Sequence, residues 1–408
     1  MRRVVITGMG VVSPLGLDLA TTWAGLVAGR SGIRALAGFD DQPVRIGGVV
    51  PDFDQVAALG VRVGRQLDRF AAFAVQAARQ AVAQAGLGEG AAPGPDGRAR
   101  WATVIGSGLG GLATYDHAVA AVDGGRRPNP YTAPGMIANA AAAAVALDND
   151  ARGPSLCPVT ACASGTDAIG MGADLIRMGR ADVVLAGGAD APLTRGLLAS
   201  FASMRAASAR NDDPAGACRP FDADRDGLVA GEGAAAVVLE ALDQARPRGA
   251  PLLAEVAGYA ATNDAHHVAS PRADGSAASA AMREAMLEAG VVPEEVGYVN
   301  AHATGTRSGD TVEACVIADT LGAGARVSAT KGASGHLMGA AGALEAVVCV
   351  QVLRTGVIPA TRNLEVIDPA CAAIDLVRGS SAAADVEVAI SNSFGFGGHN
   401  AVVVLRRV

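Results

Sequence analysis

Short apolar runs rich in β-branched residues alternate with longer alanine-rich stretches along the 408 residues of the chain. The runs have the length of strands and the stretches have the length of helices, which is typical of an α/β fold with both sheet faces covered. The predicted strands span residues 3–7, 102–106, 183–187, 234–240, 255–261, 298–301, 386–391 and 401–405. The predicted helices span residues 69–85, 164–178, 275–289, 310–321 and 339–355.

A connector rich in proline, arginine and glycine, A-R-P-R-G-A-P, interrupts this alternation at residues 245–251. A new strand follows it, so the chain is predicted to divide into residues 1–250 and 251–408. Glycine accounts for 53 residues, far above the usual ~7%, while aromatic residues make up only 3%. Small side chains of this kind allow helices, strands and ligands to approach the backbone closely.

Composition excludes several classes of protein. The chain has 33 Lys and Arg against 40 Asp and Glu, a net charge of −7, which does not favour nucleic-acid binding. No uninterrupted apolar run reaches about 18 residues, so no membrane span is expected. The six cysteines are scattered, with no C-x-x-C or H-E-x-x-H pattern, so we expect reduced thiols in the cytoplasm and no local metal site.

Two short motifs imitate known binding loops. Residues 106–111 read G-S-G-L-G-G, the dinucleotide-binding pattern, but A-T-Y-D-H after them does not indicate a glycine-packed helix and Asp123 ends no second strand. Residues 222–227 begin like a calcium loop, yet its twelfth position is Gly233 and Glu232 falls one place early. A nucleotide-dependent oxidoreductase is therefore a remote alternative, and the second motif is interpreted as a charged turn.

One cysteine is placed to act as a nucleophile. Cys162 lies in V-T-A-C-A-S-G directly before a predicted helix, where the positive end of the helix dipole favours a thiolate. We therefore expect a lowered pKa for this thiol. The other cysteines, Cys157, Cys218, Cys315, Cys349 and Cys371, are interpreted as core or loop residues.

Two histidines and a lysine lie in loops that could surround this thiol. His302 follows an apolar strand, and Lys331 and His336 share the small-residue loop T-K-G-A-S-G-H-L before an alanine-rich helix. Strand ends are where sites form in α/β sheets. A glycine-rich segment, N-S-F-G-F-G-G-H-N at 392–400, suggests backbone lying against a ligand. A single thiol with two imidazoles and a lysine indicates acyl-thioester chemistry with a second reacting carbonyl.

Several blocks in order along the chain carry a family resemblance. They are V-V-I-T-G-M-G-V-V-S-P-L-G near the start, then G-S-G-L-G-G, T-A-C-A-S-G, V-L-A-G-G-A-D, R-N-D-D-P, R-P-F-D-A-D-R-D-G and finally F-G-F-G-G-H-N. With these blocks the sequence resembles the elongating β-ketoacyl-[acyl carrier protein] synthases of the thiolase superfamily, the KAS II type. The resemblance implies a thiolase-like fold, in which two similar α/β halves form a layered αβαβα sandwich.

The resemblance also implies catalytic roles. Cys162 matches the acyl-accepting nucleophile, while His302 and His336 match the pair that holds the malonyl thioester carbonyl and promotes decarboxylation. Lys331 matches the lysine that orders the site, and Glu313 its accompanying acidic residue. The backbone N–H groups of Cys162 and Phe396 would form the oxyanion hole, and Phe396 also matches a gating phenylalanine.

Binding residues follow from the same resemblance. Thr304 and Thr306 match positions that contact a phosphopantetheine arm, and Leu109 and Phe201 match positions that line the acyl pocket. Arg62, Arg65 and Arg69 would share one face if their segment were helical. The residues expected to receive an acidic carrier protein are Arg65, Arg126, Arg127 and Arg205.

The implied reaction is a decarboxylative condensation that lengthens an acyl chain on Cys162 by two carbons, as in fatty acid elongation. The implied partner is acyl carrier protein, whose phosphopantetheine brings the substrates, so we expect no cofactor bound by the enzyme itself. A homodimer is expected, or a heterodimer with a chain-length partner if the pathway is type II polyketide synthesis. A non-catalytic binding member of the fold is a further alternative.

Overall fold

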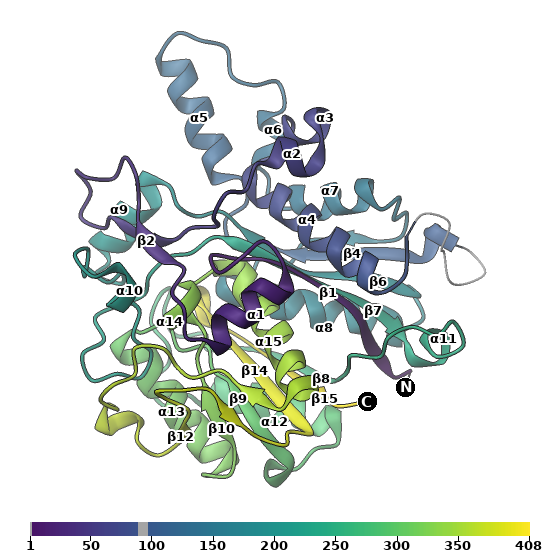
Figure 1. The fold of residues 1–408 in the computed structure, drawn as a ribbon, viewed down its shortest axis with the longest axis vertical. Helices are drawn as coiled ribbons and strands as arrows, with labels where there is room; N and C mark the ends of the chain where they lie inside the picture. The colour runs from purple at the N-terminus through teal and green to yellow at the C-terminus, as the bar shows by residue number, and fades with distance from the viewer. Residues whose placement is uncertain (1, 89–96) are drawn as a thin grey trace.

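One mixed sheet of eleven strands runs through the computed structural model, which describes residues 2–88 and 97–408 (Figure 1). The first half of the chain contributes β1 (Val4–Val12), β4 (Trp101–Gly106), β5 (Ser155–Leu156), β6 (Val183–Asp190) and β7 (Gly233–Ala241). The second half contributes β8 (Ala254–Asn263), β9 (Val296–Asn300), β10 (Arg326–Ser328), β12 (Asp375–Leu376), β14 (Val388–Gly395) and β15 (His399–Arg406).

The two halves repeat one topology. In the first half, β1 pairs with β7 and β7 with β6 in antiparallel register, and β6 pairs with β4 and β4 with β5 in parallel. In the second half, β8, β15, β14, β9 and β10 follow the same order with the same directions. The halves meet where Val5 and Ile6 of β1 pair with Glu255 and Ala254 of β8. The expectation of two similar α/β halves is therefore confirmed.

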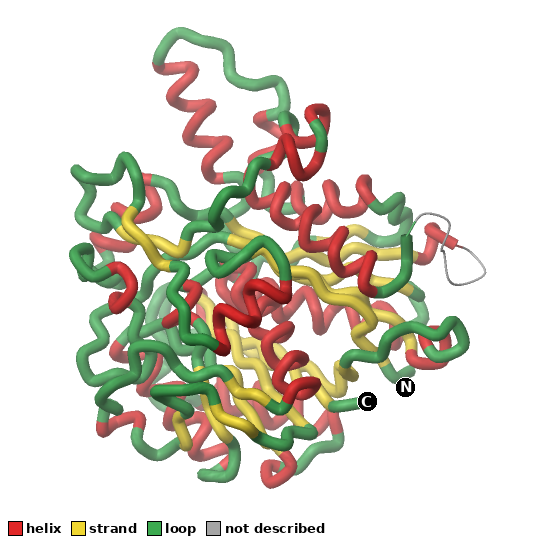
Figure 2. Tube along the Cα trace, viewed as in Figure 1, coloured by secondary structure: helices red, strands yellow, loops and turns green. Residues whose placement is uncertain are grey.

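Helices complete five layers (Figure 2). On the outer face of the first half lie α4 (Arg69–Gln84) and α7 (Ala140–Asp148), and on that of the second half lie α12 (Ser276–Ala289) and α13 (Arg307–Leu321). Between the two halves, α8 (Ser164–Arg177) packs on α15 (Ala341–Thr355). Alanine and glycine dominate these contacts: a Cβ on Gly165 would lie 2.7 Å from the carbonyl oxygen of Gly339. This is the αβαβα sandwich that the resemblance implies.

Every strand and helix predicted from the sequence is present, with ends shifted by a few residues. The sequence did not indicate a glycine-packed helix after the G-S-G-L-G-G loop, and the structure has the helix α5 (Leu112–Asp123) there. The remaining helices and strands are α1 (Leu19–Val27), α2 (Gln55–Leu59), α3 (Val61–Gly64), α5 (Leu112–Asp123), α6 (Thr132–Met136), α9 (Arg195–Ser203), α10 (Pro214–Ala217), α11 (Leu242–Ala245), α14 (Lys331–Ser334), β2 (Ile33–Ala35), β3 (Ile46–Gly48), β11 (Val357–Ile358) and β13 (Ala382–Ala383).

Among the described residues, one stretch has the length and apolar composition to cross a membrane. It is Met338–Thr355, with a mean hydropathy of 1.3, and 89% of it is buried inside the fold. The stretch contains α15, which contacts both halves of the sheet. It is the core helix of the sandwich, and its burial accounts for its composition.

Candidate active site

Cys162 lies in the middle layer, where a single 3₁₀ turn (Ala161–Ala163) leads into α8. Ala161 before it has a φ of 51°, a left-handed conformation that is strained for a residue with a side chain. The turn is held by Ser164, whose hydroxyl accepts from the Thr160 amide at 2.9 Å and donates to the Ala161 carbonyl at 2.7 Å. This geometry fixes the thiol at the start of the helix.

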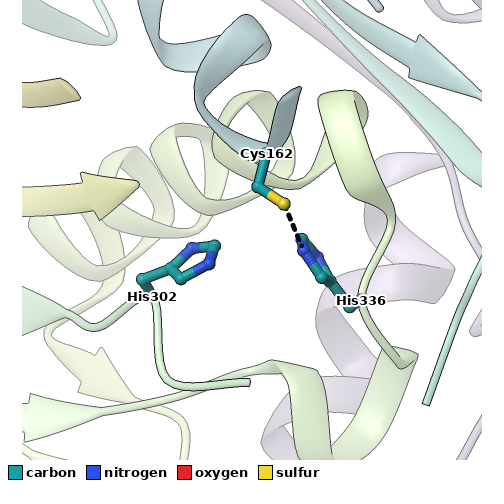
Figure 3. Close-up of side chains that lie close together, drawn as sticks. All are labelled: Cys162, His302 and His336. Carbon is teal, nitrogen blue, oxygen red and sulfur yellow. Dashed lines mark hydrogen bonds between the residues drawn. The ribbon is translucent and has the colours of Figure 1, made fainter. Parts of the chain in front are cut away.

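Two imidazoles face the Cys162 thiol (Figure 3). His336 comes from the turn between α14 and α15, and its Nε2 lies 2.9 Å from the sulfur. His302 comes from the loop after β9, and the centroids of the two imidazole rings are 5.3 Å apart with the rings nearly perpendicular. One ligand-capable atom from each of the three side chains lies within 4.8 Å of the others. The structure therefore brings together the three residues that the sequence selected.

Burial sets the protonation state of this triad. It lowers the pKa of His302 and His336 well below the usual range, and the nearby charge of Lys331 lowers both further, so both rings are neutral at pH 7. Burial raises the pKa of the Cys162 thiol to about 11, against the opposing effects of Lys331 and of the Phe396 amide that bonds the sulfur. The expected lowering of this pKa was wrong, because desolvation outweighs the charges and dipoles that favour the thiolate.

Lys331 is buried beneath the triad and forms an ion pair with Glu345 of α15. The sequence analysis had assigned Glu313 as the acidic companion of this lysine, whereas Glu345 makes the contact. Burial raises the pKa of Glu345 to about 7, with Lys331 acting in the opposite direction. A lone glutamate in the apolar run A-G-A-L-E-A-V-V-C-V was the signal that could have identified it.

Glu313 has a different task in the structure. Its carboxylate accepts from the amides of His302 at 2.8 Å and Ala303 at 2.7 Å, and from the Asn392 side chain at 3.2 Å. Burial raises the pKa of Glu313 to about 7, and these three donors oppose the shift. Glu313 therefore ties the loop that carries His302 to α13 and β14.

A largely apolar cavity of about 350 Å³ opens beside the triad. Leu109, Phe201 and Phe396 line it, and the rings of Phe201 and Phe396 meet edge to face with centroids 6.5 Å apart. Thr304 and Thr306 also line it, and their hydroxyl oxygens are 3.2 Å apart. The sequence analysis did not single out Met204, Arg272, Met338 or Phe394, which line the same cavity.

The basic residues expected at the cavity mouth are exposed: Arg65, Arg126, Arg127 and Arg205. The proposed arginine face on residues 62–69 is wrong, because α3 ends at Gly64 and Asp68 caps a new helix by accepting from the Phe70 amide. Arg69, at the start of α4, is engaged by Glu232 through two hydrogen bonds of 2.9 and 2.7 Å. It is therefore not free to bind a carrier protein.

The two motifs that imitate binding loops, at residues 106–111 and 222–227, have structural roles in the fold. The Asp190 carboxylate accepts the amides of Gly108 at 2.9 Å and Leu109 at 3.3 Å, so a protein carboxylate occupies the loop that resembles a phosphate-binding motif. The Asp222 carboxylate accepts the amides of Asp224, Glu365 and Val366 at 2.8–3.0 Å. The second motif is therefore a turn that is closed by its own first residue.

A buried thiol in contact with a neutral imidazole, beside an apolar cavity and a second imidazole, defines a thiol-dependent acyltransferase. Comparisons with known proteins specify the family. The sequence models of the beta-ketoacyl synthase N-terminal and C-terminal domains match residues 1–245 and 253–365. The chain belongs to the β-ketoacyl synthase family and is a condensing enzyme.

Individual members of the family match this chain over its full length. The chain is 43% identical to 3-oxoacyl-[acyl-carrier-protein] synthase 2 of Synechocystis sp. over 100% of this chain and 98% of that protein. It is 40% identical to the protein of the same name from Staphylococcus aureus (strain COL), with the same two coverages.

Solved structures agree as well. A beta-ketoacyl synthase from Burkholderia phymatum superimposes with a TM-score of 0.93 at 37% identity and covers 100% of both chains. The ishigamide ketosynthase/chain length factor superimposes with a TM-score of 0.89 at 36% identity, over 100% of this chain and 99% of that chain. A ketosynthase solved with a type II polyketide synthase acyl-carrier protein superimposes with a TM-score of 0.90 at 30% identity, with the same coverages.

Proposed function

We propose that this enzyme condenses malonyl-[acyl carrier protein] with an acyl chain held as a thioester on Cys162, as in fatty acid elongation. The observation that carries the proposal is the convergence of one thiol and two neutral imidazoles within 4.8 Å at the end of an apolar cavity. A hydrolase would need only one of these imidazoles as its base. The second imidazole suits a second carbonyl, that of the malonyl thioester.

In the first step the acyl group moves from the carrier thioester to Cys162. The neutral His336 ring, 2.9 Å from the sulfur, accepts the thiol proton as the sulfur attacks the acyl carbonyl. The carrier thiol leaves and takes that proton from His336. The developing oxyanion would be stabilised by backbone N–H groups of Cys162 and Phe396, and the Phe396 N–H already acts to lower the pKa of the thiol in the free enzyme.

In the second step the malonyl thioester occupies the space beside the two imidazoles. His302 forms no bond to the thiol, so its ring can donate to the malonyl thioester carbonyl, with His336 beside it. Carbon dioxide leaves and its bonding pair becomes the enolate, whose charge these donors stabilise. The carbanion attacks the acyl carbonyl and the Cys162 sulfur leaves as a thiolate, which takes up a proton from water. The chain is then longer by two carbons.

The substrates would arrive on the phosphopantetheine of acyl carrier protein, and we propose no cofactor resident in the enzyme. The hydroxyls of Thr304 and Thr306 line the cavity where such an arm would lie. The exposed Arg65, Arg126, Arg127 and Arg205 supply local positive charge on a chain whose net charge is −7. Local positive charge of this kind suits an acidic carrier protein.

A homodimer in the cytoplasm is part of the proposal. The first half of the sheet ends at β5, whose two residues are exposed and whose outer edge has no neighbouring strand among the described residues. Leu147, Leu156 and Val159 near this edge are exposed apolar side chains. An open strand edge with apolar neighbours is suited to pairing with a second copy of the chain.

A second candidate is the ketosynthase subunit of a type II polyketide synthase. It is favoured by the full-length superposition on ketosynthases solved with a chain-length factor or with a polyketide carrier protein. The two candidates differ in what the chain needs: an elongation enzyme works as a homodimer, whereas a polyketide subunit needs a separate chain-length partner.

Mass spectrometry of products tests both candidates. The purified chain alone is incubated with malonyl carrier protein and a panel of acyl carrier proteins, with Cys162→Ala as the matched control. Products two carbons longer from saturated acyl primers support elongation, and products that form only after a chain-length partner is added support the polyketide candidate. Condensation that survives in Cys162→Ala contradicts the whole proposal.

A further inference from the structure

Asp190, the last residue of β6, is a fully buried carboxylate that the mechanism above does not use. It accepts the Ser107 hydroxyl at 2.6 Å, the Gly108 amide at 2.9 Å and the Leu109 amide at 3.3 Å, all from the loop after β4. It also accepts the Gly339 amide at 2.6 Å, from the turn that leads into α15. One carboxylate thus joins a loop of the first half to a turn of the second.

The two segments held by Asp190 lie in direct contact and both contribute to the lining of the cavity. Leu109 and Met338 both line the cavity and belong to one apolar cluster that also includes Phe201. His336, the proton acceptor of Cys162, lies three residues before Gly339. The carboxylate therefore fixes the part of the cavity wall formed by Leu109 relative to the part formed by Met338.

The atoms around the Asp190 carboxylate are closely packed. A Cβ on Gly339 would lie 2.7 Å from a carboxylate oxygen of Asp190 and 2.3 Å from the Gly108 nitrogen, so only glycine fits there. Met338 beside it is held at a φ of 50°. Ser107 extends the network, because its oxygen also accepts the Gly110 amide at 2.9 Å. A buried carboxylate with this many donors holds its neighbours strongly, since charge-assisted hydrogen bonds exceed neutral ones in strength.

We propose that Asp190 is a positioning residue that sets the acyl-chain selectivity of this enzyme by clamping the Leu109 wall against the Met338 wall. The inference rests on the proposed function only in taking an acyl chain as the occupant of the cavity. Short chains that stop before these walls are unaffected by the clamp. Long chains must displace the walls, so a loosened clamp favours long chains.

The test probes the cavity by alkylation of Cys162 with N-hexyl and N-tetradecyl iodoacetamide, followed by peptide mapping, which separates Cys162 from the exposed Cys315. Asp190→Asn replaces one acceptor with a donor that faces the loop amides, and we expect the tetradecyl-to-hexyl rate ratio to rise about tenfold, the scale of one lost charged hydrogen bond. Ser107→Ala removes one donor and should raise the ratio about threefold.

Asp167→Asn is the matched control, because Asp167 is also buried near Cys162 but accepts from Thr160 and Tyr259 and does not line the cavity. It should lower stability and leave the rate ratio unchanged. An unchanged ratio in folded Asp190→Asn, or an equal change in Asp167→Asn, overturns the proposal. If Asp190→Asn does not fold, an unchanged ratio in Ser107→Ala overturns it. Alkylation needs neither acyl transfer nor condensation, so failure of the proposed function is detected separately.

Discussion

The two halves of the molecule share strand order and strand directions, yet their equivalent loops carry different chemistry. In each half a 3₁₀ turn leads into the central helix, and the first residue of that turn has a positive φ, 51° at Ala161 and 50° at Met338. The next residue is Cys162 in the first half and Gly339 in the second. The same backbone turn therefore carries the nucleophile in the first half and a glycine in the second.

The difference shows how the two halves of a repeated fold contribute different residues to one reaction. A side chain at Gly339 would collide with the Gly108 nitrogen, so the second half keeps this position open and supplies His336 from the preceding turn. In both halves a carboxylate holds the loop after the second strand: Asp190 for the β4 loop and Glu313 for the β9 loop. The first loop contributes Leu109 to the cavity wall, and the second contributes His302.

The largest expected effect distinguishes the role of His302 in condensation from the role of His336 in acyl transfer. His302→Ala should lower condensation by about 10²- to 10⁴-fold, because it removes a donor to the developing enolate. Transfer of an acyl group to Cys162 should change little, since the imidazole hydrogen-bonded to the sulfur is that of His336 and not that of His302. Intact mass spectrometry follows acylation, and carbon dioxide release follows the malonyl step. A parallel loss of acylation would contradict this division of labour.

The second prediction concerns the nucleophile of the first half, whose thiolate is favoured by Lys331 and the Phe396 amide of the second half. Burial holds the pKa of the thiol at about 11, above its usual value, so the thiolate fraction grows tenfold per pH unit until that pKa. Alkylation of Cys162 by iodoacetamide should therefore rise about a hundredfold between pH 7 and pH 9.

Peptide mapping after timed alkylation measures this profile, and Cys162→Ala shows how much alkylation the other thiols contribute. A profile that levels off near pH 7 would show that the helix dipole and Lys331 outweigh desolvation. In that case the sequence-based expectation of a lowered pKa would be correct, and His336 would not be needed as the proton acceptor.

The sequence predicted the sheet, the central helices and the reacting residues because each has a local signal. Buried strands read as apolar runs, and Cys162, His302 and His336 stand out as rare residue types at the ends of such runs. The pairing of Lys331 with Glu345 and the four donors on Asp190 have no such signal, because they join segments far apart in the chain. Burial depth, which reverses the expected pKa shift of Cys162, is likewise a property of the assembled layers.

The third prediction tests Glu313, the carboxylate that holds the loop after β9 in the second half. Glu313→Gln keeps one acceptor oxygen but directs an amide NH₂ at backbone N–H donors, so the His302 loop loses part of its anchor. We expect condensation to fall about tenfold and the free energy of unfolding to fall by about 1–3 kcal/mol. Urea unfolding and condensation by pre-acylated enzyme measure the two effects. Lost stability with unchanged condensation would make Glu313 a scaffold residue only.

The smallest expected effect lies on the surface of the first half, where α5 projects from the body of the molecule (Figure 1). Arg126 and Arg127 follow this helix and are exposed, so each contributes at most about 1 kcal/mol to binding an acidic partner. Replacing both with alanine should raise the KM for acyl carrier protein about fivefold at low salt and leave kcat unchanged. The difference should shrink as salt screens the charges.

Arg326→Ala is the control, with the change in KM compared per charge removed, because Arg326 is a partly exposed arginine on β10 in the second half, far from α5 (Figure 1). It should leave the KM for the carrier protein unchanged at every salt concentration. Equal effects from the two surfaces would mean that the carrier protein responds to net charge rather than to a docking patch. A selective effect on the first half would place the carrier beside the half that holds Cys162, where the acyl group must arrive.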